Sequence, residues 1–226
     1  MSEQTAPPTM SEEPMVAVED VTLAYRDHVV LERLSFAKPA LVSQTFSIDP
    51  PPPRDAARSR PATVISLRKV DVAPQFDGKS LLYRTGDHEL ERDPYASFAA
   101  PPADMLTAAI RQYLRDARCV RDVVEPGDEL PADLLVEVHA SELSGDFRRK
   151  DDAAGVLGPE FLVLPAPGSA DPVPLLRREY FRRKRIPSRS AAAVVVAWNQ
   201  ALSEVMQDFL ADLEVALARE PAALHE

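Results

Sequence analysis

Two segments of the sequence carry apolar residues at the three- and four-residue spacing of an amphipathic helix. The first follows Pro102, a favoured residue at the first helical position, and the second follows Ser188 and Ser190, either of which can cap a helix. The apolar positions are Met105, Leu106, Ala109, Ile110, Tyr113 and Leu114 in the first segment, and Val195, Trp198, Leu202, Val205, Phe209 and Leu213 in the second. We therefore predict two long helices, the second running to about Leu217, each with one apolar stripe that packs on a sheet.

Shorter β-prone runs, bounded by turn residues, occupy most of the remaining sequence. They predict strands at 63–73, 81–85, 88–92, 120–124, 134–147, 156–164 and 173–182, with a further strand within 38–48. Gly86 and Asp87 fit a hairpin turn between the second and third of these strands. The resulting order, β-β-β-α-β-β-β-β-α, predicts an α/β fold in which a mixed β-sheet is packed with two long helices.

Prolines divide the chain into blocks. The 226 residues include 22 prolines and only 7 glycines, and many of the prolines fall between the periodic segments. The expected divisions are a disordered tail (1–14), a β-hairpin arm (15–48), a proline-rich linker (49–61), the main domain (62–219) and a short tail (220–226). The linker should uncouple the arm from the domain, so residues up to Pro61 are expected to be dispensable for folding.

The segment 70–121 resembles the auxiliary lipoprotein component of ABC-type lipid transporters. In that family a strand ending in V-x-V-x-P is followed by a loop, a strand with a Tyr-Arg pair, an acidic strand, an aromatic-rich crossing and a helix opened by proline. The matching residues are Val70, Val72, Pro74, Phe76, Tyr83, Arg84, Tyr95, Phe98 and Pro102. The resemblance continues more weakly over 63–217.

This resemblance implies a fold similar to the N-terminal domain of TolB and a role without catalysis. The expected function is that of an auxiliary subunit of a lipid-moving ABC transporter of the mammalian-cell-entry (MCE) type. The implied partners are the MCE-domain lipid-binding subunit and the transporter complex, with phospholipid as the expected cargo. The implied location is the periplasm, at the outer membrane. The sequence as written begins without the basic and apolar stretches of a secretory signal, and its one cysteine, Cys119, follows no apolar run, so by itself it predicts a cytoplasmic protein.

The N-terminal segment 15–36 supports a competing interpretation, because it resembles the first strands of an ABC ATPase. Gly78, Lys79 and Ser80 also spell the end of a phosphate-binding loop. Ala73, however, stands where the first glycine of that loop belongs, and Pro74 removes a backbone N–H group. The alternatives are therefore a cytoplasmic ATPase-related fragment without nucleotide hydrolysis, or a nonfunctional gene-fusion product.

Charge limits the possible partners. The net charge of −10 argues against nonspecific binding of nucleic acid, which needs a basic face. One basic run is an exception and is a candidate for contact with anionic lipid, or with RNA, through Arg177, Arg178, Arg182, Arg183, Lys184 and Arg185. The competing interpretation is a solvated strand whose cations pair with the surplus carboxylates.

Candidate chemistry in the sequence is sparse. The four histidines show no metal-ligand spacing, no G-x-S-x-G motif occurs, and Cys119 is expected to be a half-buried thiol. Asp146 and Arg148 are interpreted as compensating charges at a strand end. We therefore predict no catalytic residue, no cofactor and no metal, and a protein that is not an enzyme.

One group of residues suggests a surface for a partner protein. Tyr83, Arg84, Tyr95 and Phe98 combine aromatic rings with a guanidinium group, the side-chain types that most often anchor interfaces. The alternative places Tyr83 against the sheet and pairs Arg84 with Glu89 or Glu91 across the hairpin.

Overall fold

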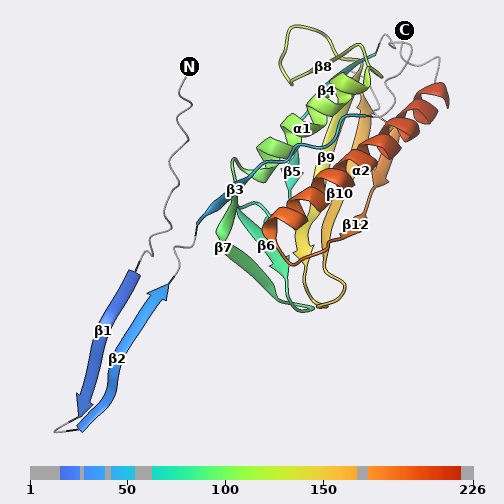
Figure 1. Ribbon diagram of the computed structural model, residues 1–226. Helices are drawn as coiled ribbons and strands as arrows, with labels where there is room; N and C mark the ends of the chain where they lie inside the picture. Colours follow the sequence, from blue (N-terminus) through green and yellow to red (C-terminus); the bar gives the residue numbers. More distant parts are fainter. Residues whose placement is uncertain (1–15, 26–27, 39–41, 54–62, 167–172, 220–226) are drawn as a thin grey trace, which may run out of the picture. The chain divides into compact units, whose positions relative to one another are not determined.

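The computed structural model describes residues 16–25, 28–38, 42–53, 63–166 and 173–219 (Figure 1). The chain divides into two compact units, and the boundary in the sequence falls between Ser43 and Gln44. In the first unit, β1 (Val16–Tyr25) and β2 (His28–Lys38) pair antiparallel, from Val16 opposite Lys38 to Tyr25 opposite His28. The predicted N-terminal hairpin is therefore present, although its turn at residues 26 and 27 lies outside the described residues.

The second unit contains a mixed sheet and two helices. Its helices are α1 (Pro102–Ala117) and α2 (Ala191–Arg219). Its strands are β3 (Gln44–Phe46), β4 (Val64–Leu67), β5 (Asp71–Val72), β6 (Ser80–Arg84), β7 (Leu90–Phe98), β8 (Asp122–Val124), β9 (Leu134–Asp146), β10 (Ala154–Pro165), β11 (Leu176–Glu179) and β12 (Arg182–Arg185). The predicted fold class, a mixed sheet packed with two long helices, is confirmed.

The long strand β9 organises the sheet. One of its edges pairs antiparallel with β10, from Asp146 opposite Ala154 to Leu134 opposite Pro165. Its other edge is shared by three short parallel strands, β4, β5 and β6, which follow one another along it. Outside this centre, β11 and β12 both pair with β10, β7 pairs with β6, β3 pairs with β7, and β8 pairs with β4.

Both helices begin and end as the local sequence dictates. Pro102 occupies the start of α1, and Arg118 ends it in the left-handed conformation, with φ of 53°. At α2, the backbone N–H of Ala193 donates to Ser190 Oγ at 3.3 Å, which makes Ser190 the cap that the sequence proposed. The helix ends at Arg219, two residues beyond the predicted Leu217.

The helices lie side by side on one face of the sheet (Figure 1). The hydroxyl of Tyr113 in α1 donates to the Ser203 carbonyl oxygen in α2 at 3.2 Å. The apolar stripes of both helices are buried, and Trp198 donates from its indole N–H to the Ser144 carbonyl oxygen of β9. A Cβ atom on Gly155 of β10 would lie 2.7 Å from that of Ala197, so glycine permits the close approach of α2 to the sheet.

The structure corrects the predicted boundary between arm, linker and domain. Residues 44–53, assigned from sequence to the arm and the linker, are part of the second unit. Strand β3 pairs in parallel with β7, and Ile48 is only 8% exposed in the core. The Asp49 N–H donates to Asn199 Oδ1 at 2.9 Å, and Ser203 Oγ donates to the Pro51 carbonyl oxygen at 3.1 Å. Both contacts reach across about 150 residues of sequence, so no local pattern could reveal them.

This packing predicts how truncation affects stability. A chain that begins at Ser43 should melt as cooperatively and at nearly the same temperature as the full chain, whereas a chain that begins at Ala62 should melt clearly lower. The single substitution Ile48→Ala should cost roughly 2 to 4 kcal/mol of unfolding free energy, because it leaves a cavity in the core. Thermal and urea unfolding measure both effects.

Val42→Ala is the matched control, because Val42 is 73% exposed. Identical unfolding of the chains that begin at Ser43 and Ala62 would contradict this role of residues 44–53.

Candidate functional site

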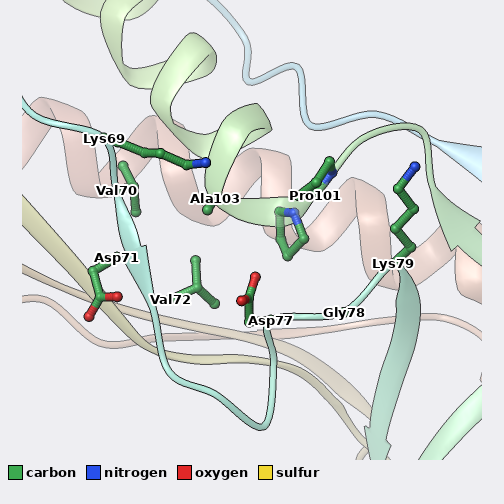
Figure 2. Close-up of a pocket in the computed structure, with 10 residues that line it drawn as sticks. Lys69, Val70, Asp71, Val72, Asp77, Gly78, Lys79, Pro101 and Ala103 are labelled. Atoms are coloured by element: carbon green, nitrogen blue, oxygen red, sulfur yellow. The ribbon is translucent and has the colours of Figure 1, made fainter.

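A hollow of 590 Å³ lies where α1 begins (Figure 2). Three segments enclose it: the residues around β5, the turn that leads into β6, and the first residues of α1. The lining residues are Lys69, Val70, Asp71, Val72, Asp77, Gly78, Lys79, Pro101, Pro102 and Ala103. The backbone N–H of Val70 donates to Thr107 Oγ1 at 2.9 Å, which fixes the β5 segment against the helix.

The charges around this hollow largely compensate one another. Lys69 forms an ion pair with Asp104 of α1 at 2.6 Å, and this hydrogen bond raises the pKa of the Lys69 ammonium group. Asp71 Oδ2 lies 2.6 Å from the imidazole Nδ1 of His139. The lining itself holds two lysines, Lys69 and Lys79, and two aspartates, Asp71 and Asp77. The hollow therefore has no strong preference for an anion or a cation.

The phosphate-loop-like segment beside this hollow does not have the geometry of a phosphate cradle. The N–H groups of Phe76, Asp77 and Gly78 donate to carbonyl oxygens within the same turn, those of Ala73, Pro74 and Phe76. Ser80 already belongs to strand β6. Since a phosphate loop needs free backbone N–H groups that converge on the ligand, this turn is unsuited to bind a nucleotide.

The four residues predicted as a partner surface do not lie together on the surface. Tyr83 is 8% exposed, stacks on Phe147 with ring centroids 4.5 Å apart, and donates from its hydroxyl to Asp93 at 2.7 Å. Burial, with the bond to Asp93, raises the pKa of the Tyr83 phenol. Phe98 is 4% exposed and packs against Trp198. These two residues are part of the core, which corrects the prediction that they contact a partner.

Arg84 and Tyr95 keep more exposed area. Arg84 pairs with Glu142 of β9 at 3.2 Å, rather than with Glu89 or Glu91 as the hairpin suggested. The sequence could not show this partner, because the parallel pairing of β6 with β9 spans about sixty residues. Tyr95 is 43% exposed on β7. Of the predicted group, Tyr95 is the aromatic residue that remains open to a partner.

The basic run forms β11 and β12, and its cations face the protein's own carboxylates. This agrees with the paired, solvated interpretation and removes the main support for a free lipid-binding patch at these residues. The ion pairs are Arg177 with Glu160, Arg178 with Asp212, Arg182 with Glu204 and Asp208, Arg183 with Asp146 and Asp152, Lys184 with Glu204, and Arg185 with Asp152.

Asp146 ends β9 in a compact charged cluster. Asp146 is 4% exposed, and its carboxylate accepts two hydrogen bonds from the Arg148 guanidinium, each at 2.9 Å, and a longer one from Arg183 at 3.3 Å. The bonds from Arg148, more than any other contact, lower the pKa of Asp146 to about 2. Burial raises the pKa of the Cys119 thiol to about 11, so that thiol is not activated.

Sequence reasoning missed a second hollow, of 550 Å³, between the β9–β10 turn and the connection from β12 to α2. It is lined by Lys150, Asp151, Ala153, Arg185, Ile186, Pro187, Ser188 and Arg189. We call it the basic hollow. The basic tripeptide 148–150 was a visible signal, but its proximity to residues 185–189 depends on the pairing of β10 with β12.

Two structural findings concern metals and membranes. In the part of the chain that the structure describes, no three His, Cys, Asp or Glu side chains gather as a metal ion would require. Neither helix, within its described residues, is both long and apolar enough to cross a bilayer.

Comparison with known proteins gives a family and a fold. The family model described as "ABC-type transport auxiliary lipoprotein component" matches residues 45–209. A crystal structure of protein XCC0632 from Xanthomonas campestris, of family DUF330, is similar with a TM-score of 0.68 and 17% identity, over 79% of this chain and 99% of that one. A crystal structure described as that of an uncharacterized protein is similar with a TM-score of 0.58 and 13% identity, over 76% of this chain and 99% of that one. No curated protein matches the sequence.

The Asp146 cluster predicts a specific pH dependence of stability. The pKa of Asp146 is lowered to about 2 in the folded protein. Its contribution to the free energy of unfolding is therefore complete at pH values above the pKa of the unfolded chain, near 4, and is lost as the pH falls towards 2. The contribution is roughly 2 kcal/mol. Urea unfolding is measured at pH values from about 5 down to about 2. Over this range Asp146→Asn should lose less unfolding free energy than the wild type.

Glu129→Gln, at an exposed carboxylate, is the control and should keep the wild-type slope. An unchanged slope in Asp146→Asn would show that the cluster does not stabilise the fold in this way.

The turn geometry predicts that the protein does not bind ATP. Titration of the full chain with a fluorescent ATP analogue and magnesium should show no saturable signal, and Lys79→Ala should behave as the wild type. Saturable binding at roughly micromolar concentration that Lys79→Ala abolishes would overturn this interpretation.

Proposed function

Because the chain belongs to the family of ABC-type transport auxiliary lipoprotein components, we propose that it is a non-enzymatic auxiliary subunit of an MCE-type transporter that moves phospholipids across the cell envelope. The observation that carries this proposal is the extent of the family match. It begins at residue 45, one residue after the second compact unit begins, and it ends within α2. The match therefore includes nearly the whole folded unit rather than one motif.

The pairing of the ionisable side chains supports a role in binding rather than in catalysis. The ionisable groups that attract attention in the sequence are engaged in structural pairs: Asp146 with Arg148, Arg84 with Glu142, and Tyr83 with Asp93. A catalytic acid, base or nucleophile needs access to a substrate, and these groups are occupied by one another. We propose that contacts with the MCE-domain lipid-binding subunit and the transporter complex replace catalysis as the protein's task.

The family implies a lipoprotein of the cell envelope. We propose that this domain works in the periplasm, at the outer membrane, next to the lipid-carrying subunit. An auxiliary protein in that position acts through its exposed faces, so the partner should contact side chains that the fold leaves open.

The open part of β7 is the strongest candidate for that contact. Strand β3 pairs only with residues 96–98, so within the described residues the outer edge of 90–95 has no neighbouring strand. Leu90 and Tyr95 are 40% and 43% exposed along this edge. Exposed tyrosines supply large contact area at low entropic cost and frequently anchor interfaces. We propose that Tyr95 is the centre of the contact with the MCE-domain subunit.

A pull-down of the MCE-domain subunit from the same organism, with the full chain as bait, tests the function. Tyr95→Ala should weaken the measured affinity by about 1 to 2 kcal/mol, roughly tenfold, because an aromatic anchor is truncated. The melting temperature should change little, since Tyr95 is partly exposed.

Phe181→Ala is the matched control, because Phe181 is an aromatic residue 56% exposed outside this edge. Equal weakening in both variants would exclude Tyr95 as the specific anchor. The absence of complex formation by the wild type would reject the proposed function itself.

A further inference from the structure

The hollows on the described surface differ in charge. The one at the start of α1 is balanced, with two lysines and two aspartates. The hollow beside Asp146 is also balanced, with Arg148, Arg149 and Arg183 against Asp87, Asp146 and Asp152. A hollow between the β11–β12 turn and α2 has two arginines against three carboxylates. The basic hollow departs from this balance, because its lining holds Lys150, Arg185 and Arg189 but only one carboxylate, Asp151, while Asp152, outside the lining, pairs with Arg185.

Lys150 is the least compensated of these cations. Among the described residues it forms no ion pair and no side-chain hydrogen bond, although the chain as a whole has ten more negative than positive charges. Arg148 of the same turn is compensated, because it pairs with Asp146 and Asp87. Arg149, the other cation of the turn, lines the balanced hollow beside Asp146 instead. Lys150 is exposed, so its ammonium group is free to meet a ligand.

The two arginines are held in place but keep donors free. Arg189 lies over the Phe147 ring, 4.8 Å from its centroid, and gives one hydrogen bond, from Nη2 to the Phe147 carbonyl oxygen at 2.9 Å. Arg185 donates from Nη2 to the Asp151 carbonyl oxygen at 2.8 Å, and its Nε lies 3.3 Å from Asp152. A guanidinium group has five N–H donors, so each arginine retains donors for a ligand. Each arginine is thus anchored by contacts of its own, and the Arg185 side chain is still 73% exposed.

We propose that the basic hollow is a binding site for a phosphate group, either of an anionic lipid head group or of a free phosphate ion. Arginine and lysine bind phosphate through charge-assisted hydrogen bonds. The Ser188 hydroxyl, which is hydrogen-bonded to Ser190 Oγ at 3.1 Å, lies at the rim. The helix α2 begins at Ala191, two residues after Arg189, so the positive end of its dipole lies next to the site. The site does not depend on which transporter the protein serves.

Two binding measurements on the full chain distinguish the sources. The first is a calorimetric titration with inorganic phosphate. The second is co-sedimentation with vesicles of phosphatidylcholine alone and with vesicles that also contain phosphatidylglycerol, at low and at physiological salt. Binding to phosphatidylglycerol vesicles without binding of free phosphate assigns the site to a lipid head group. Binding of free phosphate without binding to the vesicles assigns the site to a small anion. Either result supports a phosphate site in the basic hollow.

Charge variants locate the binding. Lys150→Glu should weaken whichever binding is seen by about tenfold or more, because it changes the local charge by two units near the anion. Lys150→Gln, which only removes the charge, should give an intermediate loss. Arg121→Glu is the control: it makes the same change in net charge at an exposed residue beside β8, at the other end of the domain (Figure 1).

The proposal is overturned by three results. The first is that neither phosphate nor phosphatidylglycerol vesicles bind the wild type. The second is that Arg121→Glu weakens binding as much as Lys150→Glu, which would indicate only a response to net charge. The third is that Lys150→Glu binds as the wild type does. Unchanged melting temperatures of all three variants establish that any loss of binding is local.

Discussion

The backbone pairing along both edges of β9 is the constraint on which the rest of the domain depends. Buried peptide groups need hydrogen-bond partners, and β9 is too central to find them in water. One edge is satisfied by β10 and the other by three short strands in succession. The segment 64–84 must therefore bend between these strands. One bend forms the hollow beside α1, and the last strand brings Arg84 to Glu142.

Helix α2 completes the domain in two ways. Its apolar stripe, with Trp198 and Phe209, covers the sheet and packs against Phe98 and Phe161. A second row of α2 residues, spaced four apart, is acidic. It consists of Glu204, Asp208 and Asp212, which pair with cations of β11 and β12. The edge of the sheet is thereby lined with paired charges, a feature that discourages pairing with strands of other chains. This compensation ends at the start of α2, where the basic hollow lies.

The start of β7 and the basic hollow lie at the same end of the sheet. The ion pair between Arg148 and Asp87, at 3.6 Å, joins the β9–β10 turn to the β6–β7 turn. The turn before β7 and the turn that lines the basic hollow are therefore neighbours. Binding groups that are already held in position bind at a lower entropic cost, which suits the auxiliary role proposed for this protein.

The sequence by itself determined the helices, most strands and the fold class, because these follow from local periodicity and from residues such as Pro102 and Ser190. It also determined that the Gly78-Lys79-Ser80 turn lacks the glycine a phosphate loop needs. Only the tertiary structure decided that Tyr83 and Phe98 are buried, that Arg84 meets Glu142, and that residues 44–53 join the core. Each of these outcomes depends on strands or helices far apart in the sequence. Periodicity describes which face of an element is apolar, but the identity of its neighbour is set by the order of strands across the whole sheet.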